Sequence, residues 1–335
     1  MSKTFRRILL ILLCLALIVA GGGYGLQHYY KTPAAYTDNK TFIIESGQGI
    51  DDIAKNLQKA GAIHTYPLFI LVETLLQHTT AYKAGEFLLK AKLSPEAISR
   101  ALRTNKPIQH RLTLKEGATA ADLRKLLQEA TSLKNDLSVP LIEGGLLPDT
   151  YFYERGESMN ALVRRMQEAM RKTVNTLWDK RAPNLPLKNQ AEAVILASIV
   201  EKETGKKSEY GVVASVFLNR LRINMPLQSD PTVIYAITGG EETLKRPISR
   251  SDLAMESPIN TYTVTGLPRS AIANPSRAAL EAVLNPPTTD YLFFVADGTG
   301  GHAFARTLQE HNANVAAWRK QKFETTSSQE NAQKK

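Results

Sequence analysis

The chain of 335 residues contains a single cysteine, Cys14, which lies inside an apolar run. No disulfide can therefore form within the chain, and a metal site built from cysteines is excluded. Hydrophobic residues make up 43% of the sequence, which is enough to bury a core. Stability must come from packing, and the length suggests two or three domains beyond any targeting segment.

The motifs of several common enzyme classes are also absent. The sequence has no His-Glu-x-x-His pair, acidic calcium loop or Gly-x-x-x-x-Gly-Lys loop, so the usual metal and nucleotide sites are not expected. It lacks the Gly-x-Ser-x-Gly elbow and the Ser-x-x-Lys motif of serine hydrolases and penicillin-binding proteins. The sequence therefore gives no indication of a metal site or of the usual nucleotide site.

A run of 19 uncharged residues, Ile8 to Leu26, is long enough to cross the hydrocarbon layer of a membrane. Lys3, Arg6 and Arg7 precede it, and this positive-inside bias predicts that everything after Tyr29 lies outside the cytoplasm. A cleaved signal peptide is the alternative, because small residues near the end of the run suit a cleavage site. A lipoprotein is disfavoured, since Leu13 before Cys14 is too large for the usual processing signal. The preferred interpretation is a single-pass anchor in a bacterial inner membrane, with the chain beyond it on the periplasmic side.

The remaining chain is predicted to be α+β. An internal repeat at an offset of 70 residues aligns Phe42, Gly47 and Leu57 with Leu112, Gly117 and Leu127, and each copy reads as a strand, a glycine turn and a helix. The predicted organisation is a cytoplasmic segment 1–7, an anchor 8–26, a polar linker 32–39, a region of small α+β modules 40–135, a mixed α+β catalytic domain 136–322 and a disordered tail 323–335. The first module resembles a LysM-like glycan-binding module, although a plain packing domain explains the same pattern.

The chemistry is predicted to lie at the end of a buried helix. Residues 191–200 are almost entirely apolar, and Glu201 and Glu203 follow them directly. Helical spacing places Glu201 on a face shared with Val194, Ala197 and Ser198, while Glu203 points along another face. Burial and the negative end of the helix dipole both favour a protonated carboxyl, which general acid catalysis requires. The alternative is that both glutamates mark where a buried helix reaches solvent.

Further along the chain, Asp230 precedes Pro231 and reads either as the N-cap of a helix or as a substrate contact. Asn274 before Pro275 reads as another helix cap. The net charge of +10 suits an anionic neighbour, which could be phospholipid, nucleic acid or the carboxylates of wall peptides. Charge alone does not choose among these neighbours.

Several motifs, in this order, resemble the endolytic murein transglycosylase (YceG-like) family over residues 143–320. They are LASIVEKET at 196–204, VASVFLNR at 213–220, QSDPT at 228–232, SPINTY at 257–262, YLFFVA at 291–296 and GH at 301–302. The resemblance implies a lyase that cuts peptidoglycan glycan strands between N-acetylmuramic acid and N-acetylglucosamine, leaves a 1,6-anhydro end and terminates strand elongation. It also implies that no cofactor is required, that the partners are peptidoglycan synthases of the penicillin-binding class, and that no nucleic acid is bound.

By the same resemblance, Glu201 is the catalytic residue, protonating the glycosidic oxygen and then taking the proton of the muramyl 6-hydroxyl. One carboxyl can serve both steps because no water has to be activated. Substrate contacts are implied for seven residues of the motifs: Glu203, Asn219, Gln228, Asp230, Thr232, Asn260 and Tyr262.

Two rival functions remain open from the sequence. A non-catalytic wall-binding scaffold for synthases would use the LysM-like region, and a hydrolytic muramidase would need Asp230 or Glu203 as a second carboxyl. The chain also departs from the family at Glu143-Gly144-Gly145-Leu146-Leu147-Pro148-Asp149-Thr150, where two aromatic positions are lost. Tyr151 and Tyr153 are the nearby aromatic residues that could replace them.

Overall fold

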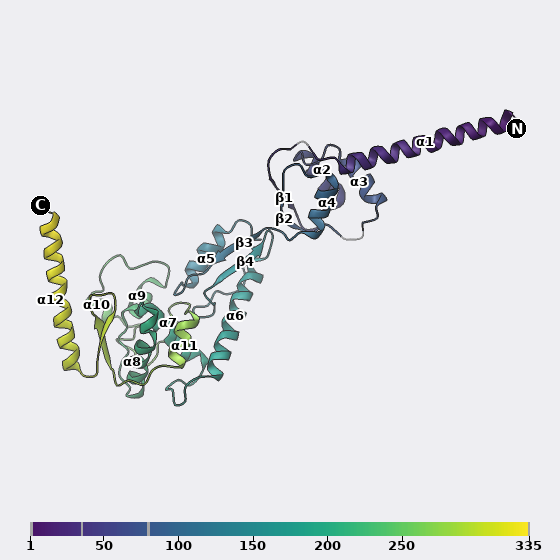
Figure 1. Cartoon of the computed structure of the whole chain (residues 1–335). Helices are drawn as coiled ribbons and strands as arrows, with labels where there is room; N and C mark the ends of the chain where they lie inside the picture. Colours follow the sequence, from purple (N-terminus) through teal and green to yellow (C-terminus); the bar gives the residue numbers. More distant parts are fainter. Residues whose placement is uncertain (1–2, 35, 79–80, 334–335) are drawn as a thin grey trace. The chain divides into compact units, whose positions relative to one another are not determined.

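The structure is a computed structural model that describes residues 3–34, 36–78 and 81–333, with the side chains of the last helix described as far as residue 320. Residues 1–2 of the expected cytoplasmic segment, residue 35 of the expected linker and residues 334–335 of the expected tail lie outside the described residues. The described chain forms two compact units of mixed α and β structure (Figure 1). The α+β fold class is confirmed.

The first unit comprises Met1–His110 together with Ser132–Lys134 and Phe152–Glu157. Its elements are α1 (Lys3–Lys31), β1 (Lys40–Ile44), α2 (Ile50–Lys59), α3 (Tyr66–Leu75), β2 (Gly85–Leu89) and α4 (Pro95–Thr104). Strands β1 and β2 pair antiparallel, with Phe42 opposite Phe87. Alternate residues of both strands face the core, so Phe42, Ile44, Phe87 and Leu89 are buried against the helices.

Helix α1 has 29 residues and is the one helix of the described chain that is long and apolar enough to cross a membrane. None of its most apolar stretch is buried within the protein, which is compatible with a single-pass anchor. The polar linker expected after it differs from the structure. Tyr30, Ala34 and Tyr36 are buried in the core of the first unit, so the segment is packed because its apolar side chains fill that core.

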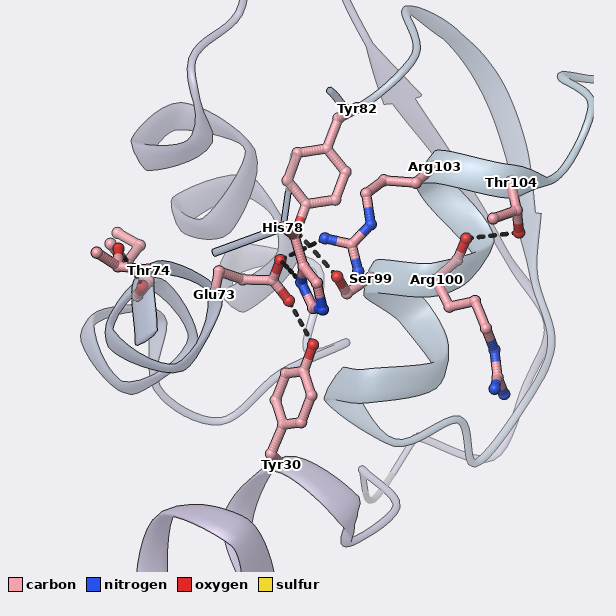
Figure 2. Close-up of polar contacts among 10 residues, drawn as sticks. Tyr30, Glu73, Thr74, His78, Tyr82, Ser99, Arg100, Arg103 and Thr104 are labelled. Atoms are coloured by element: carbon pink, nitrogen blue, oxygen red, sulfur yellow. Dashed lines mark hydrogen bonds and ion pairs between the residues drawn. The ribbon is translucent and has the colours of Figure 1, made fainter. Parts of the chain in front are cut away.

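A buried ionic cluster joins three helices of this unit (Figure 2). The Glu73 carboxylate on α3 accepts hydrogen bonds from Tyr30 on α1 and from the Arg103 guanidinium on α4, at 2.6 Å for Arg103. His78 Nδ1 lies 2.9 Å from the same carboxylate. Burial alone would raise the pKa of Glu73, but hydrogen bonds from Ser99, Tyr30 and neighbouring side chains outweigh it and lower the pKa to about 2. Glu73 therefore stays charged and ties the three helices together.

The second unit comprises Arg111–Thr131, Asn135–Tyr151 and Ser158–Lys335. The chain enters it through β3 (Gln109–Thr113) and β4 (Thr150–Glu154), which pair with each other. Its other elements are α5 (Ala120–Glu129), α6 (Met159–Asp179), α7 (Gln190–Glu203), a 3-10 turn (Lys207–Glu209), α8 (Tyr210–Arg222), α9 (Asp230–Thr238), α10 (Arg250–Leu253), α11 (Arg277–Leu284), β5 (Phe293–Ala296), β6 (His302–Ala305) and α12 (Leu308–Gln333). Helices α6, α7, α8 and α11 enclose the core.

The internal repeat is confirmed as two strand-turn-helix units. Gly47 has φ +87° between β1 and α2, and Gly117 has φ +69° between β3 and α5. Both turns need the left-handed conformation that glycine adopts at little cost. The second copy lies in the second unit, so the structure divides the chain near residue 110, whereas the sequence places a boundary at 135/136.

The tail also differs from the expectation. Helix α12 runs to Gln333, so the structure has helix over most of the segment 323–335 for which the sequence predicts a disordered tail.

Candidate active site

Helix α7 carries Glu201, and its sequence explains why the helix is buried. Asn189 caps it, its side chain accepting a hydrogen bond of 3.0 Å from the Glu192 N–H. The five residues 196–200 have no exposed surface, because the helix packs against α6, α8, α9 and α11. Glu201 follows in the last turn, where the helix reaches the surface and the side chain is partly exposed.

Two donors hold the carboxylate of Glu201. The Tyr210 hydroxyl donates to Oε1 at 2.7 Å, and the Ser276 backbone N–H donates to Oε2 at 2.8 Å. Ser276 is the N-cap of α11, so the positive end of that helix dipole faces the carboxylate. These two hydrogen bonds fix the position of the carboxyl group at the end of α7.

Tyr210 is itself a buried residue at the start of α8. Burial raises the pKa of its phenol, and the hydrogen bond to Glu201 raises it further. The hydroxyl therefore keeps its proton over the physiological range and can donate it in the hydrogen bond to Glu201.

The turn between β3 and α5 forms one wall beside Glu201. A Cβ added at Gly117 would lie 3.3 Å from Glu201 Cγ, which is tighter than an ordinary van der Waals contact. Lys202 Nζ donates to the Gly117 carbonyl oxygen at 3.2 Å and fixes the turn against the end of α7. The second copy of the repeat is therefore part of this site, a role that the repeat pattern alone did not indicate.

Two cavities flank this turn. One, of about 410 Å³, includes Glu116, Gly117 and Ala118 in its lining, and the other, of about 600 Å³, includes Lys202 and Tyr235. Both are within the size range of ligand pockets in proteins. Lys202 at the end of α7 lines the larger cavity, and Glu201 lines neither.

Glu203 lies among different neighbours from Glu201. Its Oε1 accepts a hydrogen bond of 2.5 Å from the Ser229 hydroxyl. Next to Ser229, the Asp230 carboxylate accepts a hydrogen bond of 2.6 Å from the Tyr262 hydroxyl. Glu203 and Glu201 share no hydrogen-bond partner, as their positions in the helical register predict.

The other predicted substrate contacts divide by exposure. Thr232 and Asn260 are completely buried; Thr232 donates to Ser229, and Asn260 donates to two backbone carbonyls. Asn219 likewise donates to the carbonyls of residues 289 and 291. These three side chains hold loops together, whereas Gln228 and Asp230 are exposed at the surface.

Both predicted caps in this region are one or two residues away from the observed ones. The N-cap of α9 is Ser229, and Asp230 is the first helical residue. The N-cap of α11 is Ser276, because Asn274 is used elsewhere: its amide donates to the Ala118 carbonyl and accepts from the Leu146 N–H. Pro231 lies two residues after its cap, whereas Pro275 lies one residue before its cap. The position of a proline therefore does not identify the cap in both cases, and the contacts of Asn274 are tertiary.

The altered motif that begins at Glu143 has a packing role in the structure. The Glu143 carboxylate accepts a hydrogen bond of 2.9 Å from the Ala120 N–H at the start of α5, and burial raises its pKa. Leu147, at one of the lost aromatic positions, packs against the core. Tyr153 is buried and stacked on His110, so it does not replace the missing aromatics. The Tyr151 hydroxyl donates to the Leu147 carbonyl.

Sequence reasoning missed three residues that shape this region. Tyr210 and Ser276 hold Glu201, and buried Arg220 donates to the carbonyls of Leu227 and Leu292. Tyr210 lies nine residues after Glu201, a spacing that belongs to no recognised motif. Ser276 acts through its backbone N–H, which every residue except proline has, so its residue type does not reveal this role. The one available signal was Arg220, a charge near the end of an otherwise buried helix.

We expect the stability of the second unit to depend on pH through Glu203. Burial raises the pKa of Glu203 to about 7, and Asp230 acts in the same direction. In the unfolded chain the pKa of this carboxyl is about 4.3. Between pH 4.3 and pH 7, roughly, the folded protein keeps a proton on Glu203 that the unfolded chain has lost. The free energy of unfolding therefore falls as pH rises through this range. Glu203→Gln should remove this fall, which is roughly 3 kcal/mol at most because Glu203 is partly exposed.

Denaturant unfolding at a series of pH values measures the effect. Both tryptophans, Trp178 and Trp318, lie in the second unit and report its unfolding by fluorescence. The variant should gain stability over the parent chain as pH rises from 4 to above 7. Parallel pH curves for the two proteins would show that Glu203 titrates normally in the folded state.

Comparison with known proteins places most of the sequence in one family. The chain matches the YceG-like family over residues 42–317. It is 30% identical to the endolytic murein transglycosylase of Bacillus subtilis (strain 168), over 82% of this chain and 84% of that protein. It is 28% identical to the endolytic murein transglycosylase of Streptococcus pneumoniae serotype 2, over 91% of this chain but only 64% of that longer protein.

A solved structure supports the same relationship. The crystal structure of a YceG-like protein from Listeria monocytogenes superposes with a TM-score of 0.52 at 27% identity, covering 83% of this chain and 99% of that one. Because the family match covers most of the sequence, the chain belongs to the YceG-like family.

Proposed function

We propose that this protein is a peptidoglycan lytic transglycosylase that cuts within glycan strands, between N-acetylmuramic acid and N-acetylglucosamine, and leaves 1,6-anhydro ends. The observation that carries the proposal is the Glu201 carboxyl, partly exposed at the end of a buried helix and held by two donors. The relatives named endolytic murein transglycosylase support the choice of substrate and reaction.

In the proposed reaction Glu201 acts first as an acid and then as a base. The protonated carboxyl gives its proton to the glycosidic oxygen as the bond from that oxygen to muramyl C1 breaks. The muramyl 6-hydroxyl oxygen then bonds to C1, and its proton returns to the Glu201 carboxylate. The residue ends as it began, and no water is consumed.

The hydrogen bonds indicate which oxygen of Glu201 carries the proton. The Ser276 N–H can only donate, so Oε2 stays an acceptor in both protonation states. Tyr210 has a hydroxyl, which can rotate from donating to accepting. We therefore assign the reacting proton to Oε1, with Tyr210 adjusting as Glu201 changes its charge.

The cavities beside the β3–α5 turn supply the space for the glycan on either side of the cut bond. They share Asp122 and Lys125, and Lys202 lines the larger one. The ammonium groups of Lys125 and Lys202 can bind sugar hydroxyls or the carboxylates of wall peptides. In the same proposal, exposed Gln228 and Asp230 with Tyr262 contact the substrate, while Asn219, Thr232 and Asn260 keep the surrounding loops in position.

The cellular setting is also a proposal. Lys3, Arg6 and Arg7 before the apolar run favour a retained inner-membrane anchor with both units on the periplasmic side. The family resemblance supports termination of nascent strands and partners among the penicillin-binding synthases. The LysM-like glycan contact of region 40–135 stays a prediction.

Digestion of purified glycan strands in heavy-oxygen water tests the reaction. A transglycosylase should release unlabelled muramyl ends that are lighter by one water than hydrolysis products, because the 6-hydroxyl is already tethered to the sugar. Mass spectrometry distinguishes the two. Reducing muramyl ends that carry heavy oxygen would establish a muramidase instead, and binding of strands without any cutting would establish a scaffold.

A further inference from the structure

Helix α3 has an outer face that is unusual for a helix in a water-soluble domain. Of its ten residues, Tyr66–Leu75, only Glu73 is charged, and that side chain is buried. Leu71, Leu75 and the following Leu76 are 44%, 63% and 50% exposed. A surface helix normally turns charged residues to water, and a contiguous apolar face indicates a binding surface.

The same helix is fastened to the end of α1. The Tyr29 hydroxyl donates to the Thr65 carbonyl, at the N-cap of α3, at 2.7 Å. One residue later, the Tyr30 hydroxyl donates to the Glu73 carboxylate in the last turn of α3, as Figure 2 shows. Arg103 on α4 holds the other side of that carboxylate in a buried ion pair. Moving α3 away from α1 would therefore break the buried Tyr30 hydrogen bond to a charged, fixed acceptor.

The distance from the membrane to α3 follows from the continuity of α1. The apolar run ends at Leu26, which already packs against the core of the first unit. Tyr30 is the fourth residue after Leu26 along the helix, which corresponds to a rise of about 6 Å. The polar layer of a bilayer is about 5–8 Å thick on each side. A helix bonded to Tyr29 and Tyr30 therefore lies at the level of the lipid head groups.

We propose that the face of α3 formed by Leu71, Leu75 and Leu76 binds the surface of the bilayer that α1 crosses. The leucines enter the boundary between head groups and acyl chains, in the way that interfacial helices do. The first unit is then held to the membrane at two places, the span and the apolar face of α3. The inference rests on the part of the proposed function that retains the anchor.

Fluorescent labelling of the full chain in phospholipid vesicles tests this contact. Cys14 is the sole cysteine, so Cys14→Ser removes it and a single new cysteine can carry an environment-sensitive dye. The test site is Leu75→Cys, with Leu71→Cys as a second site on the same face. The matched control is Leu88→Cys on β2, which is 51% exposed in the same unit. All three leucines are exposed, so the changes leave the core intact.

We expect blue-shifted emission at positions 75 and 71, and quenching there by nitroxide groups on the lipid acyl chains, with neither effect at position 88. Water-like emission at all three positions would overturn the proposal. A blue shift without lipid quenching would also overturn it, because a protein surface would then cover α3.

Flotation of the vesicles with the labelled protein tests the retained anchor separately from the α3 contact. A chain that fails to float with the vesicles would overturn the retained anchor and the α3 contact with it. A chain that floats but has a water-like label at position 75 would overturn the α3 contact alone. The glycan-cutting assay is independent of both outcomes.

Discussion

Replacing Glu201 with glutamine is expected to reduce glycan cutting by about 10²–10⁴-fold, the usual contribution of a general acid and base. Glutamine has nearly the same shape and can still accept the Ser276 N–H, so the fold should be preserved. It cannot give a proton to the glycosidic oxygen or take one from the 6-hydroxyl. Release of soluble fragments from purified glycan strands measures the rate, and binding of the strands should persist.

Two matched variants control for the loss of a carboxyl in the same region. Glu203→Gln and Asp230→Asn should lower the rate only in part, because an intramolecular closure needs no second carboxyl. Glu203 and Asp230 also contact Ser229 and Tyr262 rather than the partners of Glu201. A loss in either control as large as that in Glu201→Gln would refute the single-carboxyl mechanism.

The first unit should be most sensitive to the loss of Glu73. Glu73→Ala is expected to lower the stability of this unit by about 3–5 kcal/mol, because it leaves the Arg103 guanidinium buried without a counter-charge. It also removes the acceptor for Tyr30, which holds α1 to α3. Hydrogen exchange of amides in α3 and α4 should quicken by more than about a hundredfold.

Glu86→Ala is the control for that experiment. Glu86 pairs with His110 at 2.8 Å in the same unit. Histidine can lose its proton when the partner is removed, whereas arginine cannot, so we expect a loss of only ~1 kcal/mol or less. If hydrogen exchange quickened equally in the two variants, the Glu73 cluster would contribute no more to the stability of the first unit than an ordinary ion pair does.

Local patterns were sufficient for many of the individual elements. Helix α4, for example, begins at Pro95 and is capped by Ser94, and a serine followed by a proline is a local signal for a helix start. The repeat was found because its apolar residues and glycines recur at a constant offset, and the structure confirms a strand, a turn and a helix in each copy. These features depend on residues a few positions apart, which a sequence displays directly.

Features that depend on distant partners were less predictable. The segment 32–39 looked like a polar linker, yet its Ala34 and Tyr36 enter a core built from residues up to about 70 positions away. Asn274 looked like a helix cap but bonds to Ala118 and Leu146. Thr232 and Asn260 lie in prominent motifs, but their side chains are completely buried and bond inside the protein.

The sequence by itself determined the apolar α1, the buried helix that ends in Glu201, and the separation of Glu201 from Glu203, because each follows from composition and helical period along one segment. Only the tertiary structure decided what surrounds Glu201. Tyr210 and Ser276 are 9 and 75 residues away, and the wall at Gly117 comes from the repeat. The physical reason is that the reactivity of a carboxyl group depends on the hydrogen-bond donors and surfaces that folding brings next to it. Residues that meet only in the folded chain produce no periodic pattern in the sequence.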